Sequence, residues 1–521
     1  MKRTKYLSYG AMAALILMMM AATVVEKTSG TGTAFRWVYH NPLFLALWAV
    51  AAVCGLIFLI RQGLPRRPFT LGIHAGLAVI LAGALITLLS GSNGSLHLRE
   101  GETSSAFVLD DGSPASLPFG VRLDDFAIDY HPGSRMPSDY RSCVVFLPEG
   151  KAVPISMNHI AKYRGYRFYQ ADYDEDERGS ILAVSHDPWG VGITYAGYLL
   201  LLISMIGFFF EKDTAFRSAL RRVASFTAAL ALFALLPSLP AAAQPVEVQE
   251  AGQLYVQIGR PMVQSIVCLV LGVVLFVTGA VCISKGKKYP ARVLVAGIVV
   301  ALLMWLYLTL VLVLRWFASG TGPYVGRYNV MMLMAWFSTL AILLLSKRFP
   351  LIQPLGFLLS GFTMLLASRA GASLQITPLM PVLRSPLLSV HVLSMMMSYT
   401  LFGLVAFNGI MGVAVPSREA SEHLRDASLT VLYPAVFLLT FGTFLGAVWA
   451  NISWGSYWAW DPKETWALIT LLVYSFTLHG GALKPFRNAR FFHGYTIAAF
   501  LCVLITYFGV NLILGGMHSY A

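Results

Sequence analysis

The sequence predicts an all-α polytopic membrane protein, with about 13 transmembrane helices and one small β-rich domain outside the membrane. Of its 521 residues, 57% are hydrophobic and 12% are charged, whereas soluble proteins average about 45–50% and about 25%. Apolar runs long enough to cross a hydrocarbon core of about 30 Å recur from Leu7 to Leu514. Residues 91–190 form a long stretch without such a run. These observations exclude an ordinary soluble enzyme.

The individual spans follow from hydropathy and from the charge of the loops between them. Thirteen spans are predicted to start near residues 7, 42, 71, 191, 223, 261, 293, 329, 351, 387, 431, 462 and 491. With the amino terminus inside, the short inner loops hold more Lys and Arg than the short outer loops, among them Arg66, Arg67 and Lys287. Because positive loops stay in the cytoplasm, we expect the amino terminus inside and the carboxyl terminus outside.

One predicted span, residues 223–244, has a second interpretation. Its sequence VASFTAALALFALLPSLPAAAQ is also typical of a signal peptide with a small-residue cleavage site. Removing it would invert every later loop and would place Lys285, Lys287 and Lys288 outside, against the charge rule. We therefore expect this segment to remain as a crossing.

Residues 91–190 are predicted to form the β-rich outer domain. Segments such as SCVVFLP and YRFYQADY carry strand-forming residues between Gly, Pro and Asp, which is typical of short strands joined by turns. Their outer location requires three spans before them.

Charge and cysteine content argue against nucleic-acid binding and against a zinc or thioredoxin-like site. The net charge of +13 comes from basic residues in short loops, where topology signals are placed, so we expect no nucleic-acid partner. The five cysteines form no CxxC pair, and no zinc site or thioredoxin-like redox centre is predicted.

The run WGSYWAWD at 454–461, in the predicted outer loop between the eleventh and twelfth spans, is rich in aromatic residues. Its Trp454, Trp458 and Trp460 fit two different structures. Trp and Tyr form the aromatic belts of membrane interfaces, but flat rings with indole N–H donors also make a shelf for a large planar ligand. Composition leaves both interpretations open.

The residues that follow this run predict the start of a helix. Asp461 would be the N-cap, Pro462 the first helical residue, and Glu464 the reciprocal partner of a capping box. We expect Asp461 and Glu464 to be structural caps.

Four of the 11 histidines lie in or at the ends of predicted spans, where ionisable side chains are costly and often functional. His391 and His518 fall at the outer face, and His74 and His479 at the inner face. Two imidazoles at one depth can ligate a haem iron from opposite sides. The alternative for the inner pair is structural: His479 would satisfy last-turn carbonyls and His74 a neighbouring helix. The remaining histidines are expected at the surface: His40, His97, His131, His159, His186, His423 and His493.

The stretch WGSYWAWDPKETW at 454–466 resembles the WGxxWxWD loop that is the hallmark of the CcsA family of haem-handling membrane proteins. Two outer histidines flank that loop in the family. They match His391 in SPLLSVHVLSMMMSY and His518 in the terminal GGMHSYA. The family's membrane histidine after the loop matches His479 in VYSFTLH.

The amino-terminal part is similar to the ResB family, more loosely. The similarity lies in GYRFYQADYDED at 165–176, in HDPWG at 186–190, and in a membrane histidine that matches His74 in LGIHAGLAVILAGA. Together the two parts resemble a single-chain fusion of the CcsBA kind, a system II cytochrome c synthase. The outer domain is shorter than in the longer fusions.

The resemblance implies three regions. Residues 1–215 would be the ResB-like part with four spans, residues 216–260 a connecting span and outer linker, and residues 261–521 a haem-handling domain with eight spans and the WWD loop at 454–461. The location implied is the bacterial cytoplasmic (inner) membrane, with the active site on the periplasmic face.

The resemblance also implies a mechanism. Haem b would enter from the cytoplasm, be held by His74 and His479, and pass to an outer site where thiols of a CxxCH apocytochrome c add to its vinyl groups. The implied outer-site residues are His391, His518, Trp454, Trp458, Trp460 and Asp461. Because the chain has no CxxC pair, a separate thioredoxin-like partner would keep the substrate thiols reduced, and membrane lipid would surround the spans.

Two other functions use the same ligands. A haem exporter or delivery protein without synthase activity needs the outer pair equally. A b-type cytochrome that passes electrons between two haems also needs paired histidines at two depths, but such haems usually share two helices, whereas these four histidines fall on four segments. Residues alone do not separate synthase from exporter.

Overall fold

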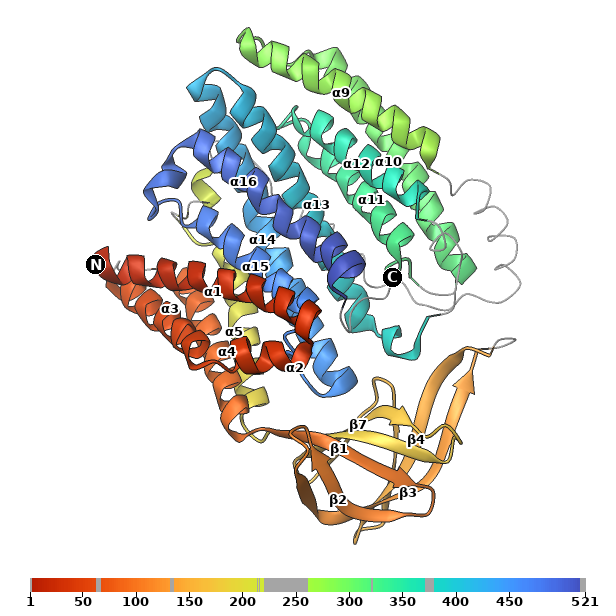
Figure 1. The fold of residues 1–521 in the computed structure, drawn as a ribbon. Helices are drawn as coiled ribbons and strands as arrows, with labels where there is room; N and C mark the ends of the chain where they lie inside the picture. The colour runs from red at the N-terminus through yellow and green to blue at the C-terminus, as the bar shows by residue number, and fades with distance from the viewer. Residues whose placement is uncertain are drawn as a thin grey trace.

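The computed structural model describes residues 2–61, 67–131, 135–212, 214, 216–219, 261–319, 322–370 and 379–515. Within these ranges, long helices form one body and an antiparallel sheet projects from one end of it (Figure 1). Ten of the described helices are long and apolar enough to cross a membrane. The chain is therefore a multi-pass membrane protein with a β-sheet domain.

Twelve of the predicted spans correspond to a helix. The amino-terminal group consists of α1 (Lys2–Ser29), α3 (Pro42–Arg61), α4 (Pro68–Ser90) and α5 (Gly190–Phe208), and the short α2 (Thr31–Ala34) and the π-helix η1 (Phe35–Tyr39) join α1 to α3. The carboxyl-terminal group consists of α9 (Met262–Ser284), α10 (Ala291–Ser319), α11 (Arg327–Leu345), α12 (Ile352–Ser368), α13 (Pro386–Ala414), α14 (Arg418–Trp454), α15 (Pro462–Leu478) and α16 (Ala489–Leu504). The π-helix η7 (Ile505–Leu514) continues α16, and short 3₁₀ turns lie at Pro381–Leu383 and Lys484–Arg487.

Two of these helices are short for a membrane. Both α12 and α15 have 17 residues, about 26 Å at 1.5 Å per residue. The predicted span at 223–244 lies outside the described residues, so the total of thirteen stays a prediction. The helix that contains the span predicted near residue 431, α14, begins earlier, at Arg418. Its first part, REASEHLRDASLT, is polar and is not detected by hydropathy, and Ser417 caps it by accepting the N–H of Ala420.

The prediction of a β-rich segment at 91–190 is confirmed. Its strands are β1 (Ser92–Arg99), β2 (Thr103–Leu109), β3 (Pro114–Tyr130), β4 (Pro137–Leu147), β5 (Lys151–Ser156), β6 (Ala161–Tyr163), β7 (Tyr166–Tyr173) and β8 (Gly179–His186). They form one antiparallel sheet in the order β5-β4-β3-β2-β1-β8-β7-β6. Alternate residues such as Leu96, Phe146 and Leu182 are fully buried on one face of the sheet, which is the period-2 pattern of a half-buried strand.

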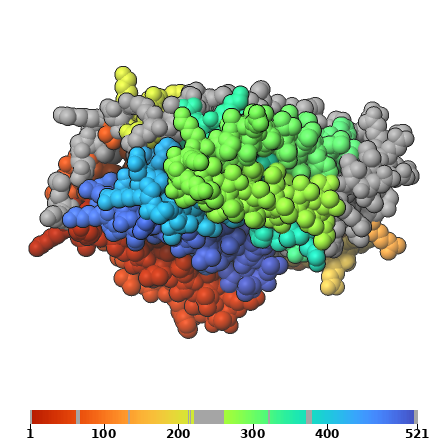
Figure 2. Space-filling model, turned by 90° about the horizontal axis from the view of Figure 1, so that it is seen from above, coloured from red at the N-terminus to blue at the C-terminus, as the bar shows by residue number. Residues whose placement is uncertain are grey.

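Small residues bring helices of the amino-terminal group together. A Cβ added to Gly83 of α4 would lie 2.7 Å from the backbone nitrogen of Thr194 in α5, so the two backbones are in close contact. The outermost helix of the other group, α9, instead exposes Val263, Val270 and Val274, a surface that suits lipid. From above, the first helices of the chain, in red, and α9, in green, lie on opposite sides of the blue carboxyl-terminal helices (Figure 2).

The helix body has two ends. The sheet-side end carries the sheet, because α4 runs into β1 and β8 runs into α5, and here α13 and α15 begin. The far end is opposite, where α15 ends and where Nζ of Lys5 in α1 donates to the carbonyl of Ala482, 2.9 Å away.

Candidate functional sites at the two ends

At the far end, two histidines from different helix groups meet. The ring centres of His74, in the second turn of α4, and His479, just after α15, are 6.0 Å apart, with their planes at 78°. Tyr9 of α1 packs its ring edge-on against His479 at 5.8 Å. The amino-terminal and carboxyl-terminal helices therefore contribute jointly to this pair.

Both imidazoles at the far end are anchored in the same way. Nδ1 of His74 lies 2.8 Å from the carbonyl of Thr70, and Nδ1 of His479 lies 2.6 Å from the carbonyl of Ser475. Each acceptor is four residues earlier on the same helix. A carbonyl can only accept, so each neutral ring carries its proton on Nδ1 and its lone pair on Nε2, the tautomer in which a ligating histidine is oriented by its other nitrogen.

A buried carboxylate holds the helix that carries His74. Oε1 of Glu211 accepts the N–H of Phe69 at 2.9 Å, and Oε2 accepts the hydroxyl of Thr70. These groups belong to the first turn of α4, whose backbone donors have no partner within the helix. Glu211 thus fixes the turn whose Thr70 carbonyl accepts from His74.

At the sheet-side end, His391 of α13 lies in a notch of the neighbouring helix α14. Its Nδ1 is 2.7 Å from the carbonyl of Gly442, which again leaves the lone pair on Nε2. A Cβ added to Gly446 would lie only 2.6 Å from Nδ1, so only glycine leaves room for this ring. The imidazole is therefore positioned by a second helix rather than by its own.

His391 lines a cavity between α11, α13, α14, α15 and η7. Apolar side chains dominate its walls, with Trp458 from the aromatic run and Arg327, Lys463 and Glu464 as the charged members. The remaining lining residues are Tyr324, Val325, Gly326, Val330, Leu383, Leu388, Val392, Met395, Met396, Tyr399, Thr443, Gly446, Ala447, Trp449, Ala467, Thr506, Tyr507 and Asn511. Three of them belong to the π-helix η7, a distortion that is frequent at functional sites.

The three tryptophans of the run at 454–461 point to different places. Trp458 lines the cavity with His391. Trp454 packs edge-on against Trp449 at 4.9 Å, whereas Trp460 stacks on Tyr39 at 4.5 Å and 17°. One tryptophan of the predicted shelf thus faces the cavity, and the other two pack on neighbouring aromatic rings.

Asp461 caps α15 as the sequence predicts, since its Oδ1 accepts the N–H of Lys463 at 2.9 Å. Glu464 reaches beyond the cap, because its Oε2 accepts the N–H of Ala459 at 2.9 Å. Its neighbour Thr465 donates to the carbonyl of Trp460 at 3.1 Å. Hydrogen bonds from the first turn of α15 therefore fix the end of the aromatic run.

The amino-terminal part holds the aromatic run from the other side. The hydroxyl of Tyr457 donates to Oγ1 of Thr87 at 2.9 Å, and Thr87 donates to Oδ2 of Asp187 at 2.6 Å. Asp187 also accepts the N–H of Gly190 at 2.7 Å at the start of α5. Burial raises the pKa of the Tyr457 phenol, so it remains a donor at neutral pH. The motif HDPWG thereby connects to the aromatic run through Thr87.

The sheet also contacts the loops around the cavity. The amide of Asn158, in the turn between β5 and β6, donates to the carbonyls of Pro381 and Val382, and its Oδ1 accepts the hydroxyl of Ser453 at 2.7 Å. Arg167 of β7 donates to Oδ1 of Asn451 at 3.2 Å. The sheet therefore ties the start of α13 to the end of α14.

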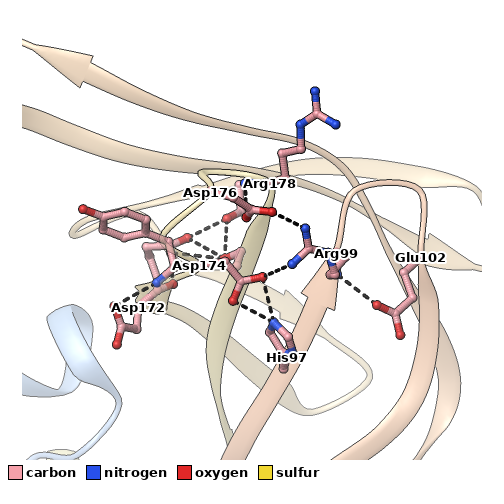
Figure 3. Close-up of polar contacts among 11 residues, drawn as sticks. His97, Arg99, Glu102, Asp172, Asp174, Asp176 and Arg178 are labelled. Atoms are coloured by element: carbon pink, nitrogen blue, oxygen red, sulfur yellow. Dashed lines mark hydrogen bonds and ion pairs between the residues drawn. The ribbon is translucent and has the colours of Figure 1, made fainter.

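The other histidines differ from one another. His518 lies outside the described residues. His493 was expected at the surface, and this was wrong: it is fully buried against α14, with Nε2 3.0 Å from the carbonyl of Ser421. The start of α16 lies inside the bundle although it follows a polar loop. His97 pairs with Asp174 in an exposed network with Arg99 on the sheet (Figure 3).

The residues that position His391 and the cationic residues that line its cavity were not predicted from the sequence. Gly442 and Gly446 form a GxxxG spacing in FGTFLGAV, and that spacing signals close helix contact in membranes. Arg327 and Lys463 have no comparable signal, because both resemble ordinary loop-end basic residues.

These features define a class: a multi-pass membrane protein with histidines at both ends of its helix body and an aromatic run at one of them. Residues 324–518 match the family described as Cytochrome C assembly protein, and residues 57–187 match the ResB-like family. The chain belongs to the CcsA family of cytochrome c biogenesis proteins and is a fused CcsBA-type member.

Three relatives illustrate the similarity. Cytochrome c biogenesis protein CcsA of Prochlorococcus marinus (strain NATL2A) is 34% identical over 260 residues, 41% of this chain and 81% of that protein. CcsA of Chlamydomonas reinhardtii is 37% identical over 233 residues, 41% of this chain and 65% of that protein. Protein NrfI of Wolinella succinogenes is 37% identical over 222 residues, 41% of this chain but only 25% of that protein. The match therefore spans a quarter of NrfI and about two thirds of the algal protein.

Proposed function

We propose that this protein carries haem across the bacterial cytoplasmic membrane and attaches it to the CxxCH cysteines of apocytochrome c. His74 and His479 would hold haem at the far, cytoplasmic end, and His391 and His518 would hold it at the sheet-side, outer end. The observation that carries the proposal is the meeting of His74 and His479, two intramembrane histidines from the two family parts, at 6.0 Å.

The far-end pair fits a haem iron. A metal held between two imidazole nitrogens at about 2 Å from each leaves the ring centres about 6 Å apart, and the observed separation is 6.0 Å. Both rings present Nε2 as the acceptor nitrogen, because both Nδ1 atoms face carbonyls. The alternative of two structural histidines explains the carbonyl contacts and an edge-to-face ring contact, and haem binding by the His74→Ala and His479→Ala variants separates the two interpretations.

The sheet-side cavity fits an apolar planar ligand with an axial imidazole. His391 presents Nε2, Trp458 and Tyr399 supply aromatic walls, and the cavity is otherwise mostly apolar. The second ligand proposed, His518, follows Gly515, the last described residue of the segment that lines the cavity with Asn511.

The proposed reaction requires positioning more than acid–base chemistry. Each cysteine S–H adds across one vinyl C=C of haem: sulfur bonds to one carbon and hydrogen to the other, with no net oxidation. His391 and Trp458 would hold the substrate haem while the substrate's own histidine replaces an axial ligand. Because the five cysteines of this chain are free thiols and form no CxxC pair, a thioredoxin-like partner would supply the reduced substrate.

The test is co-expression with an apocytochrome c in a bacterium that has no other maturation system. We expect covalent haem on the cytochrome, detected as haem that stays with the polypeptide in a denaturing gel. Haem that accumulates outside the cytoplasm without covalent attachment would favour the exporter. Purified protein that is colourless after haem-replete expression would refute haem binding altogether.

A further inference from the structure

The cavity that contains His391 also contains two cationic side chains from separate helices. Arg327 is the first residue of α11, after Gly326, and Lys463 is the second residue of α15. Both line the cavity, as does Val330 on the apolar wall. The mechanism described above uses neither cation.

The two cations differ in their polar contacts. Nζ of Lys463 donates to Oδ1 of Asn511, 2.9 Å away. Nε of Arg327 is buried and has no hydrogen-bond partner in the part of the chain that the structure describes. A buried guanidinium nitrogen without a partner is costly, so the environment of Arg327 is suited to an acceptor that arrives with a ligand.

The charged side chains among the described lining residues are two cations, Arg327 and Lys463, and one carboxylate, Glu464. Glu464 is the one carboxylate among the described lining residues, and its Oε2 already accepts the N–H of Ala459. The helices α11 and α15 both begin at the cavity, at Arg327 and Pro462, and helix N-termini favour negative charge. Apolar walls strengthen these interactions because they exclude water.

We propose that Arg327 and Lys463 bind the carboxylate groups of the ligand whose iron His391 coordinates. The inference rests on the proposed function and adds a recognition element to it: the cavity would select a porphyrin with free carboxylates and would hold its carboxylate-bearing edge at the starts of α11 and α15. Guanidinium and ammonium groups are the usual partners of carboxylates.

The test compares haem with haem dimethyl ester, which keeps the iron and the macrocycle but lacks both negative charges. Full-length protein with His74→Ala and His479→Ala, which lacks the far-end pair, would be titrated with each ligand in detergent. We expect Arg327→Gln and Lys463→Gln each to lower the affinity for haem roughly ten- to hundredfold, the range of one charge-assisted hydrogen bond. Affinity for the ester should stay unchanged.

Two controls make the outcome decisive. Arg327→Lys keeps the charge and should restore most of the affinity. Arg384→Gln removes an arginine that is exposed beside the cavity lining and should change nothing. Unchanged ester binding also shows that each variant is folded.

Different results refute the carboxylate site and the proposed function. If the background protein binds haem through His391 but all variants prefer haem over the ester equally, the carboxylate site is refuted while the proposed function stands. If Arg327→Gln and Lys463→Gln weaken ester and haem alike, the cations serve the fold or another anion, such as a lipid phosphate, and the inference is also overturned. If the background protein binds haem without His391, both the proposed function and this inference fail.

Discussion

The two ends of the helix body position histidines in opposite ways. At the far end, His74 and His479 each bond a carbonyl of their own helix, four residues back. At the sheet-side end, His391 bonds the Gly442 carbonyl of a neighbouring helix and fills a space that Gly446 leaves open. The hydrogen bond that orients each far-end ring is therefore local, whereas the one that orients the sheet-side ring depends on tertiary packing. This difference predicts which substitutions act at one end only.

The largest effect is expected from removing a proposed sheet-side ligand. His391→Gly and His518→Gly should each abolish cytochrome maturation, because the axial ligand set at the outer site is lost. Added imidazole should restore part of the activity, since the deleted ring leaves a cavity of its own size. The measurement is covalent haem on a co-expressed apocytochrome, with and without imidazole. Full maturation in either variant would show that the residue is not a ligand.

A substitution on the neighbouring helix should come next. In Gly446→Ala the new Cβ would lie 2.6 Å from Nδ1 of His391, so the ring must move. Overpacking of this kind costs about 1–3 kcal/mol, or roughly five- to hundredfold in occupancy of the sheet-side site. The matched control is Gly494→Ala, where a Cβ meets nothing within 4 Å. Haem spectra of the two variants measure the difference. Equal spectra would contradict the close packing of His391 against Gly446.

Replacing the far-end histidines should have a smaller, different effect. His74→Ala or His479→Ala should lower haem content several-fold without changing the spectrum of the haem that remains, because α15 separates His479 from Pro462 by about 26 Å. Quantified haem and its absorption spectrum test this. If His479→Ala leaves haem content and maturation intact, His479 is a helix-end histidine and haem reaches the outer site by another route.

The contact between the aromatic run and the amino-terminal part should matter less still. Tyr457→Phe keeps the ring and removes the hydrogen bond to Thr87, a loss of about 1 kcal/mol. We expect a small drop in thermal stability. We also expect an altered spectrum of haem at the sheet-side site only, because Trp458, which follows Tyr457 directly, lines the cavity of that site. Thr87→Val should cost more, because it also removes the hydrogen bond to Asp187, and the double variant should add little to Thr87→Val alone.

The smallest effect is expected on the sheet. The Arg99 guanidinium lowers the pKa of the Asp176 carboxyl, so any stability from this exposed pair is present above the ordinary carboxyl pKa of about 4 and is lost as pH falls through the lowered value. Asp176→Asn should therefore unfold at nearly the wild-type temperature at pH 7. The two melting curves should converge as pH falls through the lowered pKa, and the haem spectra of the two proteins should agree at each pH.

Features fixed by local contacts could be predicted from the sequence, whereas features fixed by tertiary packing could not. Helix starts at Pro42, Pro386 and Pro462 agree with the predicted spans, because Pro at the first helical position is a local signal. The depths of His74 and His479 also follow from counting along a helix. The separate directions of Trp454, Trp458 and Trp460 depend on which distant ring each one meets, and adjacent positions in the sequence do not encode that. His493 was misplaced for the same reason.

The aromatic run contacts parts of the chain that are synthesised much earlier. Thr465 meets Tyr39 across 426 residues, and Tyr457 meets Thr87 across 370. At about 5–20 residues per second, the ribosome needs roughly 20–80 s to bridge such an interval. Tyr39 and Thr87 are thus already synthesised while their later partners are still missing. Covalent fusion ensures that the late segment finds the early surface on its own chain, at a local concentration that a separately made subunit would lack.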